Sequence, residues 1–200
     1  MLDEGTAQLE TSDPLVQFDT WYREAWASER DANAMACATA DADGVPSVRM
    51  VLLKGREADG FVFYTNFGSR KGHEIGANPR ASLVFHWKSL KRQVRIDGTV
   101  ETVDDAAADA YFASRPRDSQ VAAWASLQSE VLHERFELEK RLAHFELKFK
   151  GGPVPRPPHW SGYLVRAEKL EFWLDRPYRL HERIVFQRAS REWHVTRLYP

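Results

Sequence analysis

The sequence predicts a mainly β fold with added helices, organised as an antiparallel barrel. Short apolar runs follow one another between residues 35 and 101, and tight turns such as the one ending at Gly44 separate them. Residues 93–101 alternate between apolar and polar side chains, as a half-buried antiparallel strand does, the apolar ones being Val94, Ile96 and Val100. A parallel doubly wound sheet would need strands that alternate with helices, and this block does not supply them.

The chain is expected to begin with a flexible polar lead over residues 1–12 and to continue as one domain over residues 13–200. Ser12-Asp13-Pro14 predicts a helix start, because a capping residue precedes a proline that suits the first turn. Apolar residues then recur at helical spacing, at Leu15, Phe18, Trp21, Tyr22 and Ala25. Strands are expected at 35–40, 48–54, 61–65, 81–85 and 93–101, with a short helix over 69–78.

The second half of the chain returns to helices and then to strands. Helices are expected over residues 104–113 and 130–150, and a Gly/Pro-rich connector follows over 151–158. The longer helix carries an apolar stripe that indicates core or subunit packing, made of Val131, Leu138, Leu142, Phe145 and Phe149. Strands are expected to close the chain at residues 162–166, 170–173, 184–188 and 193–198.

Composition and charge argue against several classes of function. The net charge is −1, so no global field recruits nucleic acid or an acidic membrane surface. Cys37 is the single cysteine and lies in an apolar run, which predicts a buried, unreactive thiol. No stretch is typical of a membrane span or a signal peptide, so a cytoplasmic location is expected. Phosphate-loop, dinucleotide and zinc motifs are also missing, and no metal site is expected.

Two segments place cations where they could meet a phosphate. The strand Arg49-Met50-Val51-Leu52-Leu53-Lys54 has a basic residue at each end, which could reach solvent or could present two cations to one phosphorylated ligand. Farther along, Tyr64-Thr65 ends a strand, a glycine turn follows, and a helix begins with Ser69-Arg70-Lys71. The free N–H groups and the dipole of a helix start favour a bound phosphate.

A third segment combines a cation with hydroxyl groups. Tyr111, Arg115 and Ser119 recur at four-residue steps, and Pro116 forces the segment to bend. A phenol, a guanidinium and a hydroxyl on one bent segment suit a phosphate ester. An exposed basic turn is the alternative, but it does not explain why all three side chains are good phosphate ligands.

The fourth segment is Arg179-Leu180-His181-Glu182-Arg183, near the end of the chain. In a strand, Arg179, His181 and Arg183 would share one face. Three cationic groups on one face repel one another, so a bound anion is a natural hypothesis there.

These segments belong to a longer series of eight short sequence motifs. The motifs are Arg49-Met50-Val51-Leu52-Leu53-Lys54, Phe63-Tyr64-Thr65-Asn66, Gly68-Ser69-Arg70-Lys71, Arg92-Gln93-Val94, Ser114-Arg115-Pro116-Arg117-Asp118-Ser119-Gln120, Trp124-Ala125-Ser126-Leu127-Gln128-Ser129, Glu171-Phe172-Trp173 and Arg179-Leu180-His181. Each motif alone is weak evidence for a family, but together and in this order they resemble the pyridoxine 5′-phosphate oxidase family. The resemblance covers the chain from Asp13 onward and implies a homodimeric split β-barrel with FMN at the subunit interface.

The resemblance also implies roles for individual residues. FMN would be bound from one subunit by the strand Arg49–Lys54 and by Tyr64, Thr65, Arg70, Lys71 and Gln93. The other subunit would reach the same FMN with Gln128, Ser129, Trp173 and Arg183. The substrate phosphate would be held by Lys54, Tyr111, Arg115 and Ser119, while Arg179, Leu180 and His181 would lie near the pyridine ring. Arg179 and His181 are the expected catalytic pair.

The implied reaction is the oxidation of pyridoxine 5′-phosphate or pyridoxamine 5′-phosphate to pyridoxal 5′-phosphate. A hydride would pass from the C4′ carbon to the flavin, and dioxygen would reoxidise the flavin to yield hydrogen peroxide, with ammonia released from the amine substrate. The flavin carries the redox chemistry, and the protein supplies orientation and electrostatics. The expected partners are the two substrates, dioxygen and a second copy of the chain, without nucleic acid or membrane.

Three alternatives remain open from the sequence. A phenazine-pathway flavin oxidase carries a similar Arg-Leu-His-Glu-Arg segment, but its substrate would not require the phosphate ligands Lys54, Tyr111, Arg115 and Ser119. A flavin- or vitamin-binding protein without turnover would need neither Arg179 nor His181. A nucleic-acid binder would depend on the basic run 88–92, which is short in a chain that is neutral overall.

Overall fold

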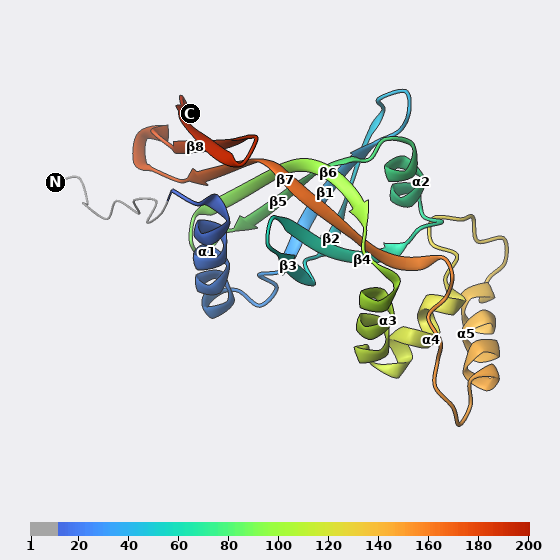
Figure 1. Ribbon diagram of the computed structural model, residues 1–200. Helices are drawn as coiled ribbons and strands as arrows, with labels where there is room; N and C mark the ends of the chain where they lie inside the picture. The colour runs from blue at the N-terminus through green and yellow to red at the C-terminus, as the bar shows by residue number, and fades with distance from the viewer. Residues whose placement is uncertain (1–11) are drawn as a thin grey trace.

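The computed structural model describes residues 12–200, so the expected flexible lead over residues 1–12 lies outside the described residues apart from Ser12. Figure 1 shows a curved sheet with helices placed around it. In chain order the elements are α1 (Pro14–Ser28), β1 (Ala34–Ala40), β2 (Pro46–Leu52), β3 (Gly55–Glu57), β4 (Gly60–Asn66), α2 (Arg70–Ala77), β5 (Arg80–Trp87), β6 (Arg92–Thr102), α3 (Asp105–Ser114), α4 (Arg117–Ala125), α5 (Glu137–Lys148), β7 (Trp160–Leu174), a 3-10 turn (Pro177–Arg179), β8 (Glu182–Ala189) and β9 (Glu192–Leu198).

The described strands form one sheet in which neighbouring strands all run antiparallel. Their order is β2-β1-β5-β6-β7-β4-β3, and the hairpin of β8 and β9 extends from β7. The two end strands, β2 and β3, are separated in sequence only by Leu53 and Lys54, so the sheet must curl to bring its ends together. The Lys54 N–H donates to the Val62 carbonyl at 2.8 Å and fixes this bend. The predicted antiparallel barrel with added helices is confirmed.

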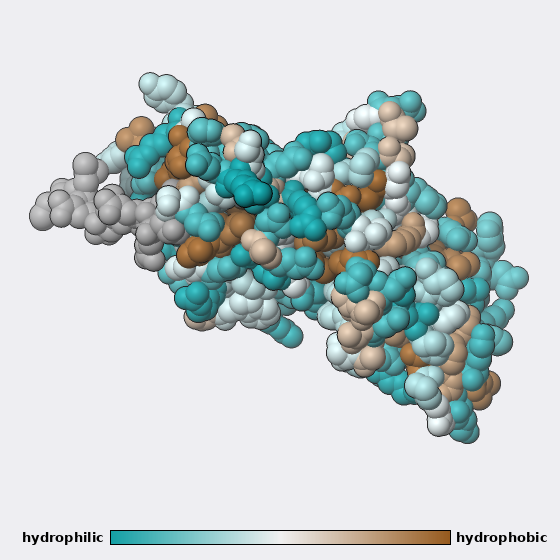
Figure 2. All heavy atoms as spheres, in the orientation of Figure 1, coloured by the Kyte–Doolittle hydropathy of each residue, from teal (hydrophilic) through white to brown (hydrophobic). Residues whose placement is uncertain are grey.

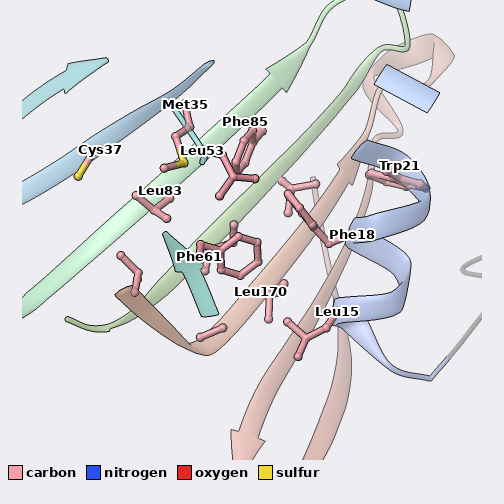
Figure 3. Close-up of a cluster of buried hydrophobic side chains, with 14 of the residues drawn as sticks. Leu15, Phe18, Trp21, Met35, Cys37, Leu53, Phe61, Leu83, Phe85 and Leu170 are labelled. Carbon is pink, nitrogen blue, oxygen red and sulfur yellow. The ribbon is translucent and has the colours of Figure 1, made fainter. Parts of the chain in front are cut away.

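The main core lies between α1 and the inner face of the sheet. Asp13 caps α1, because its Oδ1 accepts from the Leu15 N–H at 2.8 Å, which confirms the predicted helix start. Phe18 of α1 is fully buried, and its ring centroid lies 4.8 Å from that of Phe61. Figure 3 shows these side chains pointing toward one another from the helix and the strands. Cys37 belongs to the same core, and burial raises the pKa of its thiol to about 11, as expected for an unreactive cysteine.

A second apolar cluster lies among α3, α4 and α5, which Figure 1 shows together at one end of the sheet. Phe112 of α3, Val121 of α4 and Trp160 at the start of β7 are buried there. Three residues of the predicted stripe pack against this cluster, namely Leu142, Phe145 and Phe149. Val131 and Leu138, the other two, stay exposed. The stripe therefore contributes to core packing over its second half only.

Two helix predictions differ from the structure. The helix expected over residues 130–150 begins at Glu137, because Phe136 has a left-handed backbone (φ 68°) that an α-helix cannot include. Residues 117–125 were expected only as part of a bent segment, but they form α4. Pro116 takes the N-cap position of that helix. A proline at a helix start costs no hydrogen bond, so it separates α3 from α4 without preventing either.

Two strand predictions also differ. The strands expected at 162–166 and 170–173 are one continuous strand, β7, because β6 pairs along its whole length. The register shifts once, at Gly98, where a side chain would place its Cβ 1.9 Å from the Arg166 carbonyl oxygen. Only glycine allows this close approach. Residues 55–57, expected as a turn, pair with β4 as the short strand β3.

The surface is mainly hydrophilic on the face shown in Figure 2, where apolar residues gather in small patches. The edge strand β2 is different, because Val48, Met50 and Leu52 expose 68%, 64% and 44% of their area. No helix within residues 12–200 is long and apolar enough to cross a membrane.

Candidate active site

A cavity of about 770 Å³ lies where β2 and β4 meet α2, α3 and the start of α4. Most of the residues that the sequence predicts as ligands line it, namely Arg49, Met50, Val51, Leu52, Lys54, Tyr64, Thr65, Arg70, Lys71, Tyr111, Arg115, Ser119, Gln128 and Ser129. Leu53 does not, because its side chain is buried in the main core. A cavity of this size is typical of cofactor and small-molecule sites.

The start of α2 delivers two cations to this cavity. Ser69 caps the helix, its Oγ accepting from the Gly72 N–H at 3.4 Å. Gly72 lies so close to the preceding turn that an added Cβ would be 2.1 Å from the Phe67 carbonyl oxygen. The glycine therefore lets α2 begin directly after β4 and places Arg70 and Lys71 at the cavity wall.

Lys71 is buried, although its ammonium group reaches the cavity wall. Its Nζ donates to Thr65 Oγ1 at 2.9 Å and to Gln128 Oε1 at 2.9 Å. Burial, and then the positive charge of Arg49, lowers the pKa of Lys71. The hydrogen bond to Gln128 connects the loop after α4 to the start of α2. Within one chain, Gln128 therefore lines the same cavity as Arg49, Arg70 and Lys71, which together are called the Arg49 cluster.

Glu74 connects two members of the Arg49 cluster, Arg49 and Arg70, although the sequence had not identified it as a site residue. Its Oε1 accepts from Arg70 Nε at 2.8 Å, and its Oε2 accepts from Arg49 Nη2 at 3.1 Å. The hydroxyls of Ser47 and Thr39 also donate to Oε2, the first at 2.6 Å. Burial alone would raise the pKa of Glu74, but these hydrogen bonds lower it to about 2. The i,i+4 spacing from Arg70 was the only signal in the sequence.

A second candidate set of anion ligands lies on α3, on α4 and at the bend between them. The guanidinium of Arg115 packs over the Trp160 ring, and burial lowers the pKa of Arg115. Its Nη1 is buried and has no hydrogen-bond partner among residues 12–200. Tyr111 stacks on Tyr64 with ring centroids 3.9 Å apart, and Ser119 lies in the first turn of α4, which no side chain caps. A half-buried arginine whose buried Nη1 lacks a hydrogen-bond partner in the described part of the chain, beside an uncapped helix start, is suited to bind a phosphate.

A third group of predicted residues lies elsewhere on the sheet. The strand register pairs Gln93 with Trp173 and Trp173 with Arg183, so the three lie side by side on β6, β7 and β8. The His181 ring centroid lies 4.7 Å from that of Trp173. Arg183 Nε donates to the buried carboxylate of Glu171 at 2.7 Å.

The prediction that Arg179, His181 and Arg183 share one strand face is wrong. β8 begins only at Glu182, and Pro177 opens a 3-10 turn in front of it. Arg179 has a φ of 60° and is exposed, as is Leu180 beside it. Proline fixes its own φ and lacks an N–H, so the segment turns where a strand was expected.

Acidic side chains lie beside several of the basic groups in and around this segment, which reduces the repulsion expected there. His181 Nδ1 lies 3.0 Å from Asp175 Oδ1, and Arg176 Nε donates to Glu182 Oε1 at 2.7 Å. The Arg176 N–H lies 3.1 Å from the same His181 nitrogen and donates to it only when Nδ1 carries no proton, whereas a contact with Asp175 needs that proton, so the two contacts orient the ring in alternative protonation states. Although carboxylates surround this histidine, no group of three or more potential metal ligands gathers anywhere in the described part of the chain.

The cavity and the third group lie apart within one chain. Figure 1 shows β8 at the opposite end of the sheet from α3 and α4, and none of the third group lines the cavity. The structure therefore places Gln128 and Ser129 with the Arg49 cluster, and Gln93 with Trp173. The resemblance had implied the reverse grouping for these glutamines and for Ser129.

Comparison with known proteins places this architecture in a family. A family model described as pyridoxamine 5′-phosphate oxidase matches residues 22–149, and one described as the pyridoxine 5′-phosphate oxidase C-terminal dimerisation region matches residues 160–200. A pyridoxine/pyridoxamine 5′-phosphate oxidase of Sphingopyxis alaskensis is 59% identical over 196 residues, which cover 98% of this chain and 90% of the relative. The corresponding protein of Rhodospirillum rubrum is 56% identical over 97% of this chain and 100% of its own length.

Solved structures show the same fold. PhzG from Burkholderia lata 383, solved with tetrahydrophenazine-1-carboxylic acid, has a TM-score of 0.90 and 30% identity, over 96% of this chain and 94% of its own. A pyridoxamine 5′-phosphate oxidase-related FMN-binding protein of Nostoc punctiforme has a TM-score of 0.74 over 95% of this chain and 100% of its own, and at 17% identity it supports the fold alone. By its fold, its two family models and its curated relatives, this chain belongs to the pyridoxamine 5′-phosphate oxidase family.

Proposed function

We propose that this protein oxidises pyridoxine 5′-phosphate and pyridoxamine 5′-phosphate to pyridoxal 5′-phosphate with FMN as cofactor. The observation that carries the proposal is that one cavity holds two separate anion-binding sets. One consists of Arg49, Arg70 and Lys71, and the other is built around Arg115 with Ser119. An enzyme that brings a phosphorylated cofactor to a phosphorylated substrate needs both sets.

The first set fits the phosphate of FMN. Arg49 and Arg70 are held by Glu74, and Lys71 is a buried ammonium, so three cations face one carboxylate. A phosphate monoester carries a charge of about −1.5 to −2 at pH 7, which such a cluster can balance. Gln128 and the other residues of the wall would hold the rest of the cofactor. Bound FMN would accept a hydride from the substrate C4′ carbon and would be reoxidised by dioxygen with release of hydrogen peroxide; with the amine substrate, hydrolysis of the imine product by water would release ammonia.

The second set fits the substrate phosphate. Arg115 offers a buried, unpaired Nη1, and Ser119 and Tyr111 add hydroxyl groups at the same wall. Lys54 lines the cavity at the end of the β2 strand and adds a further cation. The burial of Arg115 Nη1 strengthens the attraction of this group for an anion.

We infer that the site is completed by a second copy of the chain. The family model for a dimerisation region covers residues 160–200, which include the third group except Gln93. The edge strand β2 exposes Val48, Met50 and Leu52 beside the cavity, as a subunit interface would. One subunit would then supply the cavity with Gln128 and Ser129, and the other would supply Gln93, Trp173, Arg183, Arg179, Leu180 and His181.

In this arrangement Arg179 and His181 act on the substrate ring. Asp175 and the Arg176 N–H both contact His181 Nδ1, so the ring is fixed and its Nε2 is left to meet the substrate. Arg179 is exposed at a turn and can reach across an interface. Together the two side chains would orient the C4′ group for hydride removal and would stabilise charge that develops on the pyridine ring.

A phenazine-type oxidase is the second candidate, since PhzG has the same fold at 30% identity. To separate the two, the FMN-loaded protein is mixed without oxygen with pyridoxine 5′-phosphate or pyridoxamine 5′-phosphate while the flavin absorbance is followed. Bleaching that reverses in air, with formation of pyridoxal 5′-phosphate, is the expected result. If neither phosphate ester bleaches the flavin of the FMN-loaded protein, the proposal is contradicted. That result would favour the phenazine-type oxidase or a binding protein.

A further inference from the structure

Glu74 connects the two arginines of the first anion-binding set while staying outside the cavity. Its carboxylate is only 5% exposed and is not part of the cavity wall. Each oxygen holds one guanidinium, Oε1 that of Arg70 at 2.8 Å and Oε2 that of Arg49 at 3.1 Å. The two arginines come from different elements, α2 and β2, so this carboxylate is the bridge that sets their relative orientation.

Two hydroxyl groups close the network around the same carboxylate. Thr39 Oγ1 donates to Glu74 Oε2 and accepts from Arg49 Nη1 at 2.5 Å. Ser47 Oγ donates to the same oxygen at 2.6 Å and accepts from Arg49 Nη2. Arg49 is therefore tied to Glu74 directly and through both hydroxyls, and its Nη1 also donates to the Cys37 carbonyl at 3.1 Å. A network of this kind restricts the Arg49 side chain strongly, while Arg70 is held by its single bond to Oε1.

Charge and orientation make opposite predictions for the removal of this carboxylate. As a negative charge next to the cations, Glu74 weakens their attraction for an anion, so its removal would strengthen phosphate binding. As the group that orients Arg49 and Arg70, it strengthens phosphate binding, because it holds both positive charges in fixed positions beside the cavity and directs the N–H groups that it does not itself occupy. The number and shortness of its contacts favour orientation as the larger effect.

We propose that Glu74 is a positioning residue that orients Arg49 and Arg70 for the phosphate of the cofactor. This inference rests on the proposed function, which assigns that phosphate to the Arg49 cluster. Glu74 touches neither cofactor nor substrate. It acts through the two arginines, so its removal should weaken the binding of a ligand that carries a phosphate. The binding of the same ligand without the phosphate should not change.

The test compares the binding of FMN and riboflavin, which differ only in the phosphate. Apoprotein of wild type, Glu74→Ala and Glu74→Gln is titrated with each flavin, and the quenching of flavin fluorescence gives the two Kd values. Glu168→Ala is the matched control, because Glu168 also pairs with an arginine, Arg80, but neither lines the cavity. Circular dichroism and thermal unfolding establish that each variant is folded.

Glu74→Ala is expected to raise the Kd for FMN by about tenfold or more and to leave that for riboflavin within about twofold. Glu74→Gln should be intermediate, because the amide keeps one acceptor oxygen, and the control should match wild type. An FMN Kd that is unchanged or lower in Glu74→Ala would overturn the inference, as would an equal loss for both flavins. If wild type itself binds FMN no better than riboflavin, the phosphate assignment in the proposed function is wrong, and the inference falls with it.

Discussion

The guanidinium carbon of Arg115 lies 4.7 Å from the centroid of the Trp160 ring. Trp160 in turn stacks on Tyr64 and Tyr111, with centroids 5.3 and 6.2 Å away and interplanar angles of 9° and 5°. The aromatic stack supports the cation from one side and leaves its buried Nη1 without a protein partner among residues 12–200. A cation fixed in this way is ready to bind an anion without further rearrangement.

Arg115→Ala should therefore raise the KM for the phosphorylated substrate on the order of 10- to 100-fold, as expected for the loss of a charge-assisted contact. The Kd for FMN should stay within about twofold, because other cations hold that phosphate. Steady-state kinetics and a flavin titration measure the two effects. Arg117→Ala is the control, because Arg117 bonds the carbonyls of Gly152 and Phe149 and does not line the cavity. A loss of FMN affinity with an unchanged KM would reverse the assignment of the two anion-binding sets.

The bend that carries Arg115 shows how far the sequence could predict this site. Pro116 correctly indicated a break, and the four-residue steps correctly grouped Tyr111, Arg115 and Ser119. The helix after the break was missed, because a proline inside a helical pattern stops one helix and can equally begin the next. Local sequence patterns thus identified Tyr111, Arg115 and Ser119, but they did not predict the backbone structure that positions these residues.

Non-local contacts explain what the sequence could not predict. Glu74 is recognisable as part of the site only when β1 and β2 bring Thr39, Ser47 and Arg49 to it. Gln93 lies with Trp173 because of the register between β6 and β7, which no local pattern specifies. The barrel strands were predicted well because alternation and turn residues are local signals.

Glu74 should also make stability depend on pH in the acid range. Its pKa is lowered from 4.5 to about 2 in the folded protein, so its contribution is complete above about pH 4.5 and is lost as the pH falls toward 2. The shift corresponds to a contribution on the order of 3 kcal/mol. Urea unfolding of wild type and Glu74→Gln, measured from pH 7 down to pH 3, should show a difference in unfolding free energy that shrinks with acid. A difference that stays constant over that range would show that the ionised carboxylate is not the stabilising form.

Arg179→Ala should lower kcat/KM by about tenfold or more while FMN stays bound. The residue is exposed at the 3-10 turn, so the variant should fold like wild type. Stopped-flow reduction of the bound flavin by substrate measures the affected step directly. Arg191→Ala, at the exposed turn between β8 and β9, is the control for loss of a surface cation. Turnover equal to wild type would remove Arg179 from the site.

A composite site between two subunits predicts that two impaired variants rescue each other when activity is measured at a substrate concentration near the wild-type KM. Arg115→Ala damages the cavity, and His181→Ala damages the third group, none of whose members lines that cavity; His181 directly precedes β8, which Figure 1 shows at the other end of the sheet from α3 and α4. In a heterodimer of the two variants, one site would combine both defects and the other would combine neither.

The two chains are co-expressed with different affinity tags, and the heterodimer is purified through both tags. It should recover about half of the wild-type activity per dimer, because one of its two symmetry-related sites is intact. Each variant homodimer, purified in the same way, measures the background. If every site were built from one chain, the heterodimer would contain no intact site and its activity would stay at that background. The recovered fraction thus distinguishes a shared site from a self-contained one without any assumption about the geometry of the interface.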